Sequence, residues 1–314
     1  MSGHPHLSIV VPVYNSAATV QALAKQITAA LAKAPWPFEI ILVNDGSRDE
    51  SWNEIVSAAG KYPSILGINL MRNYGQHNAL LAGIQHAQGK VIVTMDDDLQ
   101  HPPAEIDKLL TTLEQGSDVV YGVPEQERHG LWRDLASRIS KLALRIVMRI
   151  EIADQTSAFR AFRSQAIQAH MQFNGPFVDI DALLAWGTSR FATVSVRHME
   201  RRDGVSNYTF FSLVSHALKM VTAFSTLPLR VATVTGFAFM IFSVGVLAWV
   251  VGRYLIEGES VPGFPFLASI IGLFSGAQLF AMGIMGEYLA KIHLRSMGRP
   301  AAVVRERTRA PRDP

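Results

Sequence analysis

Three consecutive aspartates, Asp96, Asp97 and Asp98, are the residues of this sequence best suited to chemistry. They follow an apolar run at residues 91–95 that predicts a buried strand. Because side chains alternate along an extended chain, Asp96 and Asp98 are expected on one side and Asp97 on the other. Two carboxylates at a strand end are hard oxygen ligands, suited to a Mg²⁺ or Mn²⁺ ion that bridges a diphosphate. Taken alone, the triplet is weak evidence for a metal site, because a solvated acidic turn that caps the next helix has the same residues.

The elements around the triplet alternate between strands and helices. Apolar runs predict strands at residues 7–11, 39–43, 65–70, 90–95 and 118–121. Helical patterns occur between them, at residues 16–33, after residue 49, at residues 76–87 and after residue 103. This repetition predicts an α/β fold with a mostly parallel sheet and helices on both faces. Ligands of such folds bind at the carboxyl ends of the strands, where residues 44–47 (Asn-Asp-Gly-Ser) and the aspartate triplet both fall.

The composition favours a soluble domain combined with a few membrane spans. Of the 314 residues, 49% are hydrophobic and 18% are charged, and the mean hydropathy is +0.18. Those values are too apolar for an ordinary soluble enzyme and too charged for a pure membrane bundle. The chain has no cysteine, which excludes disulfides, zinc-thiolate sites and a thiol nucleophile. No Gly-x-Gly-x-x-Gly fingerprint is present, which argues against a nicotinamide enzyme.

Two segments near the end of the chain, residues 231–252 and 265–286, contain no charged residue. Each is about 20 residues long, the length that an α-helix needs to cross a bilayer. A buried helical hairpin is the alternative, although two such segments rarely occur together in a small soluble protein. The sequence therefore predicts two transmembrane helices.

The distribution of basic residues predicts the orientation of these helices. The intervening loop, residues 256–264, has no Lys or Arg. Basic residues flank the other ends of the two segments: Arg230, Lys291, Arg295 and Arg299. By the positive-inside rule, both ends of the hairpin are cytoplasmic and the short loop lies outside. Arg253, at the outer end, is an exception to this pattern. The expected location is the inner (plasma) membrane, with a multi-pass topology.

Two further segments resemble helices that lie along a membrane surface. Residues 129–150 place apolar side chains at helical spacing beside a row of Arg and Lys, and residues 210–225 lead into the first span. Such helices can lie in the lipid interface, with their cationic side chains reaching the phosphates. The alternative is a surface helix that faces the protein core. The basic tail, residues 291–314, favours anionic lipid over nucleic acid because it follows an apolar span directly. Beyond Arg305 we expect the tail to be disordered.

Three motifs occur in order on successive strand ends: residues 10–15 (Val-Val-Pro-Val-Tyr-Asn), 43–47 (Val-Asn-Asp-Gly-Ser) and 95–102 (Met-Asp-Asp-Asp-Leu-Gln-His-Pro). With them, the chain resembles the family 2 glycosyltransferases of GT-A fold (Rossmann-like), and within these the polyisoprenyl-phosphate glycosyltransferases. That group includes dolichyl-phosphate mannose synthase and the bacterial GtrB-type and ArnC-type enzymes. Further segments match at residues 72–77, 157–160, 201–206, 228–230 and 286–289. The resemblance extends from residue 7 to near residue 300.

The resemblance implies a donor site at the strand ends. Its residues would be Pro12, Tyr14, Asn15, Asp45, Arg72, Asp96 and Asp97. Asp45 would contact the nucleotide base, in a pocket shaped by Pro12 and Tyr14. Asp96 and Asp98 would hold the metal, Mg²⁺ or Mn²⁺, together with the diphosphate. The sequence departs from the usual pattern at Asn44, Asp97 and Ala158, and none of these departures removes a metal ligand.

The resemblance also implies an acceptor site. The residues that would bind the phosphate of the acceptor lipid are Arg201, Arg202, Ser206 and Arg160. The candidate catalytic carboxylates are Asp154 and Asp98. A lipid phosphate has a second pKa of about 6, so near neutral pH it is already a nucleophile. We therefore expect Asp154 to position groups or to stabilise positive charge on the sugar instead of removing a proton. His77, Asp179 and Asp181 are open between functional and helix-capping roles.

The resulting hypothesis is an inverting transferase that moves one sugar from a nucleotide sugar, expected to be UDP-linked, to polyprenyl phosphate, expected to be undecaprenyl phosphate. The product would be a lipid-linked sugar for modification of cell-envelope glycans. One alternative is a processive polysaccharide synthase, but its additional spans and Gln-x-x-Arg-Trp motif are not visible. The other is a membrane protein that binds nucleotide sugars without catalysis. The expected partners of the transferase are its two substrates, the nucleotide sugar and polyprenyl phosphate, and the membrane; nucleic acid is not expected.

The domain organisation follows from the same resemblance. Residues 1–228 would form the cytoplasmic catalytic domain, including the interfacial segments 129–150 and 210–225. Residues 229–290 would form the transmembrane hairpin, and residues 291–314 the basic cytoplasmic tail. Because relatives form tetramers, the resemblance also raises a homotetramer as a hypothesis.

Overall fold

The computed structural model describes residues 6–124, 155–171, 173, 177–199, 221–257 and 263–308. Several predicted features lie outside these residues. They are the helix at 129–150, most of the segment at 210–225, and the candidate site residues Asp154, Arg201, Arg202 and Ser206.

Within the described residues, eight strands form a single sheet with the order β7-β5-β6-β4-β1-β2-β3-β8. The strands are β1 (Leu7–Val13), β2 (Phe38–Asn44), β3 (Ile65–Leu70), β4 (Val91–Thr94), β5 (Val119–Pro124), β6 (Arg160–Arg163), β7 (Phe191–Val196) and β8 (Val304–Arg307). β1 pairs in parallel with β2 and β4, β2 with β3, and β5 with β7. β6 and β8 run antiparallel to their neighbours. The prediction of a mostly parallel α/β sheet is therefore confirmed.

Helices cover both faces of this sheet. The helices around the sheet are α1 (Ala17–Leu31), α2 (Ser51–Lys61), α3 (Gln76–Ile84), α4 (Ile106–Glu114), α6 (Gln165–Gln168) and α7 (Ile180–Gly187), with a 3-10 turn at Pro103–Glu105. The helices α1, α2 and α4 pack against one face, and α3, α6 and α7 against the other. Alternate residues of β4 divide between the two cores, Val93 on the α1 side and Ile92 on the α3 side. The apolar period of two along each strand thus builds both layers.

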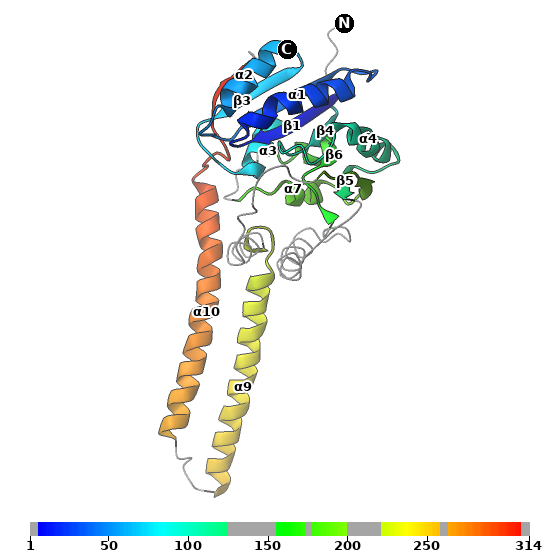
Figure 1. Ribbon diagram of the computed structural model, residues 1–314. Coiled ribbons are helices and arrows are strands. Elements are labelled where there is room, and N and C mark those ends of the chain that lie inside the picture. The colour runs from blue at the N-terminus through cyan, green and yellow to red at the C-terminus, as the bar shows by residue number, and fades with distance from the viewer. Residues whose placement is uncertain are drawn as a thin grey trace.

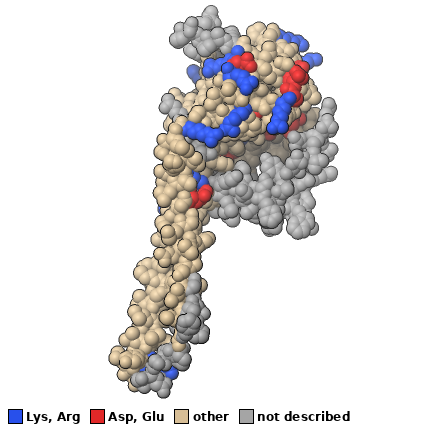
Figure 2. All heavy atoms as spheres, turned by 90° about the vertical axis from the view of Figure 1, so that its left-hand side faces the viewer, with Lys and Arg blue, Asp and Glu red and all other residues tan. Residues whose placement is uncertain are grey.

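A long helical hairpin follows the domain. α9 (Leu227–Glu257) and α10 (Phe264–Ser296) extend side by side away from the sheet (Figure 1). The rings of Phe239 and Phe274 contact each other between the two helices, with their centroids 5.4 Å apart. In Figure 2, the described residues on the visible face of the hairpin lack charged side chains between its two ends. Within the described residues, α9 is long and apolar enough to cross a membrane, and none of its apolar window is buried. α10 contains the second predicted span, but within the described residues it does not meet the same criterion of length and apolar composition.

The C-terminal tail contradicts the expected disorder beyond Arg305. From α10 the chain returns to the sheet (Figure 1) and adds β8 as an antiparallel strand beside β3. Side chains reinforce this pairing: Asn69 Nδ2 donates to Glu306 Oε1 at 2.8 Å, and Gly67 N donates to Thr308 Oγ1 at 2.9 Å. The physical reason is that β3 would otherwise be an edge strand with unpaired backbone groups. The prediction of disorder was therefore wrong for residues 306–308.

Candidate active site

The polar strand ends meet at one edge of the sheet, because β4, β1 and β2 are neighbours. Hydrogen bonds join the loops that follow these strands. Tyr14 N, after β1, donates to Asp97 Oδ2 at 3.2 Å, and Asn15 N donates to Ser47 Oγ at 3.0 Å. Asn15 itself has a left-handed backbone, with φ at 53°. The motifs that the sequence singled out after β1, β2 and β4 therefore form one continuous surface.

The aspartates of the triplet point in different directions. Asp96 Oδ1 accepts a hydrogen bond of 2.6 Å from Nε2 of Gln76, the first residue of α3. Asp97 contacts the loop before α1, on the opposite side of the sheet, and burial raises the pKa of its carboxyl. Asp98 Oδ1 accepts from Gln100 N at 3.1 Å, in a turn where Leu99 has a φ of 61°. All three side chains are half-buried. Asp96 and Asp97 thus diverge as predicted, although β4 ends at Thr94 and the triplet lies beyond it; that Asp96 and Asp98 share one side stays a prediction.

This arrangement suits a divalent metal that is shared with a substrate. Within the described residues, no group of three or more His, Asp or Glu side chains forms a ready-made metal cluster. Mg²⁺ is commonly bound by one or two carboxylates together with substrate phosphates and water. Asp96 and Asp98 supply carboxylates of the kind that this mode requires, and their role as metal ligands stays a prediction.

Asp45 binds the backbone of its own chain. The side chain is 3% exposed, and its two oxygens accept from Tyr74 N at 2.7 Å and from Gly75 N at 2.8 Å. Burial raises the pKa of this carboxyl, although the two hydrogen bonds oppose that effect. Asp45 therefore fixes the turn that begins α3, and in the same turn the Arg72 guanidinium lies 4.4 Å from the centre of the Tyr74 ring. The contact of Asp45 with a nucleotide base stays a prediction.

Gly46 allows the turn of residues 72–75 to lie close to the loop after β2. Its φ is 65°, and a Cβ atom at this position would lie 2.4 Å from the carbonyl carbon of Arg72 and 2.5 Å from the nitrogen of Asn73. Both contacts are with backbone, which cannot rotate away. Only glycine fits here without displacing residues 72–75 from Asp45.

We therefore expect Gly46→Ala to lower the free energy of unfolding by about 3 kcal/mol, from left-handed strain and overpacking together. Denaturant unfolding in detergent, followed by tryptophan fluorescence, measures the change. Gly60→Ala is the matched control, because it lies in α2 with open space around its Cα and should be neutral or stabilising. Equal stability of the two variants would contradict the assigned role of Gly46.

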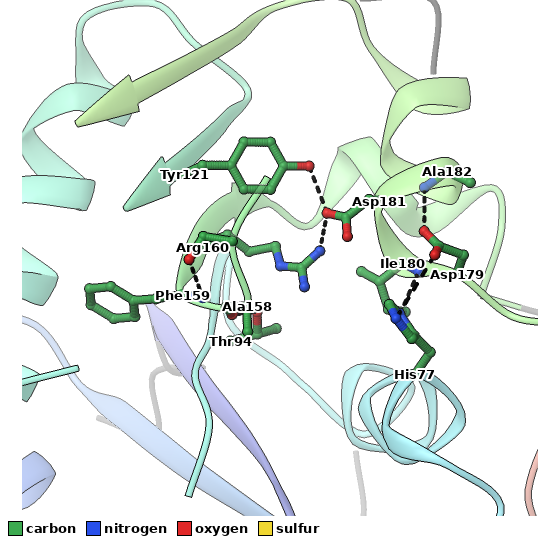
Figure 3. Close-up of polar contacts among 11 residues, drawn as sticks. His77, Thr94, Tyr121, Ala158, Phe159, Arg160, Asp179, Ile180, Asp181 and Ala182 are labelled. Carbon is green, nitrogen blue, oxygen red and sulfur yellow. Dashed lines mark hydrogen bonds and ion pairs between the residues drawn. The ribbon is translucent and has the colours of Figure 1, made fainter. Parts of the chain in front are cut away.

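A buried polar network joins β5, β6 and α7 (Figure 3). Arg160 is 2% exposed, and its guanidinium forms an ion pair with Asp181 Oδ1. Tyr121 donates its hydroxyl proton to the same oxygen at 2.7 Å. The prediction that Arg160 binds the acceptor phosphate is not tested directly. However, the structure gives this guanidinium a buried carboxylate partner instead of an open position.

Two other polar residues, Asp179 and His77, form hydrogen bonds at the start of α7. Asp179 caps the helix, since its Oδ1 accepts from Ala182 N at 2.9 Å. His77 Nδ1 accepts from Ile180 N at 3.1 Å, so the ring proton lies on Nε2, 3.9 Å from Asp179 Oδ2 (Figure 3). For Asp179, the capping alternative is therefore the one observed. His77 links the first turns of α3 and α7.

Two described segments connect the triplet with candidate residues that lie outside the description. Thr94 Oγ1 donates to Ala158 O at 2.8 Å, and Thr94 is paired with Arg160, so residues 155–158 run beside the end of β4. Asp154 immediately precedes them in the sequence. After β7, Met199 N donates to Gln100 O at 2.8 Å. The chain therefore enters the segment containing Arg201 beside the loop that follows the triplet.

The sequence analysis did not identify His101, which lies directly after this loop. The side chain is 8% exposed, and its ring stacks on Phe159 at 5.1 Å and meets His198 edge-on at 5.0 Å. Burial lowers the pKa of His101 to about 4, and the neighbouring His198 charge adds to this effect. His101 is therefore neutral at pH 7 and packs as an aromatic wall of the site. Its position in the sequence, three residues after Asp98, was the available signal.

Known proteins resemble this chain over most of its length. The family described as Glycosyl transferase family 2 matches residues 8–171. The undecaprenyl-phosphate 4-deoxy-4-formamido-L-arabinose transferase of Enterobacter sp. (strain 638) is 36% identical over 298 residues, covering 94% of this chain and 91% of the relative. The enzyme of the same name from Shewanella sediminis (strain HAW-EB3) is 34% identical over 303 residues, covering 96% of this chain and 92% of the relative.

Solved structures share the fold. Glucosyl-3-phosphoglycerate synthase from Mycobacterium tuberculosis, crystallised with Mn²⁺, uridine diphosphate and phosphoglyceric acid, has a TM-score of 0.52 and 16% identity. The match covers 70% of this chain and 77% of that chain. It supports the GT-A architecture of the sheet and its helices. Together with the relatives, which match over nearly the whole chain, these findings show that the chain belongs to glycosyl transferase family 2 and is a glycosyltransferase.

Proposed function

We propose that this enzyme transfers a single sugar, with inversion, from a UDP-linked nucleotide sugar to undecaprenyl phosphate at the cytoplasmic face of the membrane. The observation that carries the proposal is similarity along 94% to 96% of the chain to transferases named for undecaprenyl phosphate. The apolar helix α9 supports a membrane-held acceptor. The sugar to test first is 4-deoxy-4-formamido-L-arabinose, which the names of those relatives specify.

The donor would bind at the strand-end edge of the sheet. Asp96 and Asp98 would hold Mg²⁺ or Mn²⁺, and a bound metal neutralises negative charge on the leaving diphosphate. The nucleotide would lie over the loop after β1, which carries Tyr14 and Asn15. The turn of residues 72–75, held by Asp45, would form the opposite wall.

The acceptor would attack as a phosphate dianion. Its second pKa is about 6, so at neutral pH the oxygen nucleophile needs no general base. A new bond forms between this oxygen and the anomeric carbon, while the bond from that carbon to the diphosphate breaks. Arg201, Arg202 and Ser206 would bind the acceptor phosphate, because arginine presents a planar fork of donors that is always charged. Asp154 would stabilise the positive charge that develops on the sugar.

The membrane anchor would be the hairpin of α9 and α10, with both helices crossing the bilayer. Arg230 lies in the first turns of α9, and Arg295 and Arg299 lie at or beyond the end of α10, all on the side of the catalytic domain. This distribution favours a cytoplasmic catalytic domain. The domain would comprise residues 1–228 together with β8, and residues 229–290 would span the membrane.

Gln76 orients one of the proposed metal ligands. Its amide donates to Asp96 Oδ1 at 2.6 Å. When a group that holds a metal ligand in place is removed, the affinity of the site for the metal typically falls. We expect Gln76→Met, which keeps the length of the side chain and loses the donor, to weaken Mn²⁺ binding about tenfold. Titration of free Mn²⁺ by electron paramagnetic resonance measures this affinity without turnover.

The matched control is Gln85→Met, at the other end of α3. The Gln85 amide also donates to a neighbour, the carbonyl of Met171 at 2.5 Å, but it contacts neither Asp96 nor Asp98. Its Mn²⁺ affinity should equal that of the parent enzyme. Equal affinities for all three proteins would rule out an orienting role for Gln76.

Transfer of radiolabelled sugar to extractable lipid tests the proposed function. Purified enzyme in liposomes with undecaprenyl phosphate, a divalent metal and a panel of labelled nucleotide sugars should yield a lipid-linked monosaccharide with one donor. A water-insoluble polymer would instead identify a processive synthase. Donor binding without any product would identify a non-catalytic binding protein. Either result would overturn the proposal.

A further inference from the structure

Four aromatic side chains gather where the catalytic domain meets the hairpin. We call them the aromatic collar: Phe173, Phe177, Trp186 and Phe224. Trp186 lies on α7, and Phe224 lies three residues before α9. The ring centroids of Trp186 and Phe224 are 5.4 Å apart, and those of Phe173 and Phe224 are 6.3 Å apart. The collar thus joins the catalytic domain to the chain that leads into α9.

Further contacts place the collar at the domain end of both long helices. Tyr288, on α10, donates its hydroxyl proton to Ser225 O at 2.6 Å, and Lys291 donates to Thr222 Oγ1. The guanidinium of Arg295, in the last turn of α10, lies 6.0 Å from the centre of the Phe173 ring. In Figure 1, α7 lies on the side of the domain from which the hairpin extends. The collar therefore lies level with the ends of both helices.

The collar is not a closed core. Trp186 is 48% exposed, which is unusual for the largest apolar side chain of a well-packed cluster. Exposed apolar residues of α9 continue from this level, beginning with Leu227 and Val231. Exposed basic residues lie at the same ends of the two helices: Arg230 near the start of α9, and Arg295 and Arg299 at or beyond the end of α10. An apolar surface bordered by arginines fits the headgroup layer of an anionic bilayer, where tryptophan is enriched because its ring is apolar and its N–H is polar.

We infer that the aromatic collar docks the catalytic domain directly on the lipid surface, with Trp186 in the headgroup region of the cytoplasmic leaflet. This inference rests on the proposed membrane hairpin and goes beyond it, since two spans alone would leave the domain free to tilt on its linkers. Because Trp186 lies on α7, which packs on the sheet, the collar fixes the height of the strand-end site above the bilayer. The occupant of the surface is lipid, because the charge and the apolar continuity match a bilayer.

Tryptophan quenching tests the inference. The chain has five tryptophans, so variants that keep only one are made with phenylalanine elsewhere. Each is reconstituted into phosphatidylcholine–phosphatidylglycerol liposomes whose acyl chains carry bromine either near the headgroup or near the chain end. Trp186 should be quenched at least about twofold more by the shallow bromines than by the deep ones, and shielded from aqueous acrylamide. Trp52, on α2, is the control remote from lipid, and Trp249, on α9, is the control within the bilayer.

Two outcomes would overturn the inference: quenching of Trp186 by acrylamide without quenching by bromolipid, or no quenching by either agent, as expected if protein covers the collar. If the single-tryptophan variants do not fold, Trp186→Phe is compared with its parent in a protein that already carries Trp132→Phe, because Trp132 lies in the predicted interfacial segment; the change at Trp186 should then abolish the shallow-quenched component. The measurement needs no turnover, so an inactive Asp96→Asn enzyme should give the same result. Loss of quenching at Trp249 as well would refute the membrane hairpin, whereas loss at Trp186 alone would refute only the collar's role.

Discussion

Asp96→Asn is expected to slow sugar transfer by about a thousandfold, equivalent to ~4 kcal/mol of activation free energy, while the protein stays folded. The reason is electrostatic: an amide is a poor ligand for a hard divalent cation, so charge on the leaving diphosphate would no longer be neutralised. The asparagine keeps the oxygen that accepts from Gln76 Nε2, so the local hydrogen bond can survive. Initial rates measured over a range of Mn²⁺ concentrations test the expectation.

Asp97→Asn is the matched control for this variant: the resemblance implies a donor contact for Asp97, but its carboxylate is engaged by the loop before α1. Asp97 contacts the backbone of Tyr14 on the opposite side of the strand, and an asparagine oxygen can accept the same hydrogen bond. We expect its rate to remain within about tenfold of the parent enzyme. Comparable losses in both variants would show that the whole triplet acts as a diffuse acidic patch. A mild loss in Asp96→Asn alone would remove Asp96 from the proposed metal site.

The largest effect on stability is expected at the buried ion pair of β6 and α7. Asp181→Asn should lower the free energy of unfolding by about 3–5 kcal/mol, because the Arg160 guanidinium would keep its charge in a buried position without its ion-pair partner. The Tyr121 hydroxyl would also lose its charged acceptor. Denaturant unfolding of the catalytic domain within the intact protein measures this change.

Removing the guanidinium as well should recover part of the loss. In the double variant Arg160→Met with Asp181→Asn, no uncompensated buried charge remains, so the effects of the two changes should not add. Arg190→Met is the surface control, because it removes the ion pair with Asp118 at an exposed position and should change stability far less. If Asp181→Asn were as mild as this control, the ion pair would not be a structural element of the domain.

The sequence predicted the parallel part of the fold well. β1 to β5 are short apolar runs. Their apolar pattern is contained in the run itself, so each strand could be predicted without knowledge of its partners. β6, β7 and β8 were not predicted, because their pairing depends on distant partners. β8 is the clearest case: Asn69 meets Glu306 across 237 residues of sequence, and nothing in the composition of the tail distinguishes a basic strand from a disordered segment.

For the site, the residue types predicted which strand ends form it, but not which contacts the side chains make. The opposed directions of Asp96 and Asp97 follow from strand geometry and could be predicted. The engagement of Asp45 with Tyr74 and Gly75 could not, because it depends on a turn in which Gly75 has a φ of 95°. The contact of Gln76 with Asp96 depends on the same turn. For Arg160, the motif suggested a phosphate ligand and the fold adds a buried ion pair with Asp181, which the motif could not indicate.

The acceptor in the proposed reaction is a phosphate held at the membrane. Enzyme in liposomes with Mn²⁺ and the active nucleotide sugar would be offered either undecaprenyl phosphate or undecaprenol, which has the same chain and a hydroxyl in place of the phosphate. We expect a product with undecaprenyl phosphate alone, lost on metal chelation, and detected by mass spectrometry as the lipid phosphate plus one sugar residue. Equal transfer to undecaprenol would contradict it, as would the absence of a lipid-linked product with every donor.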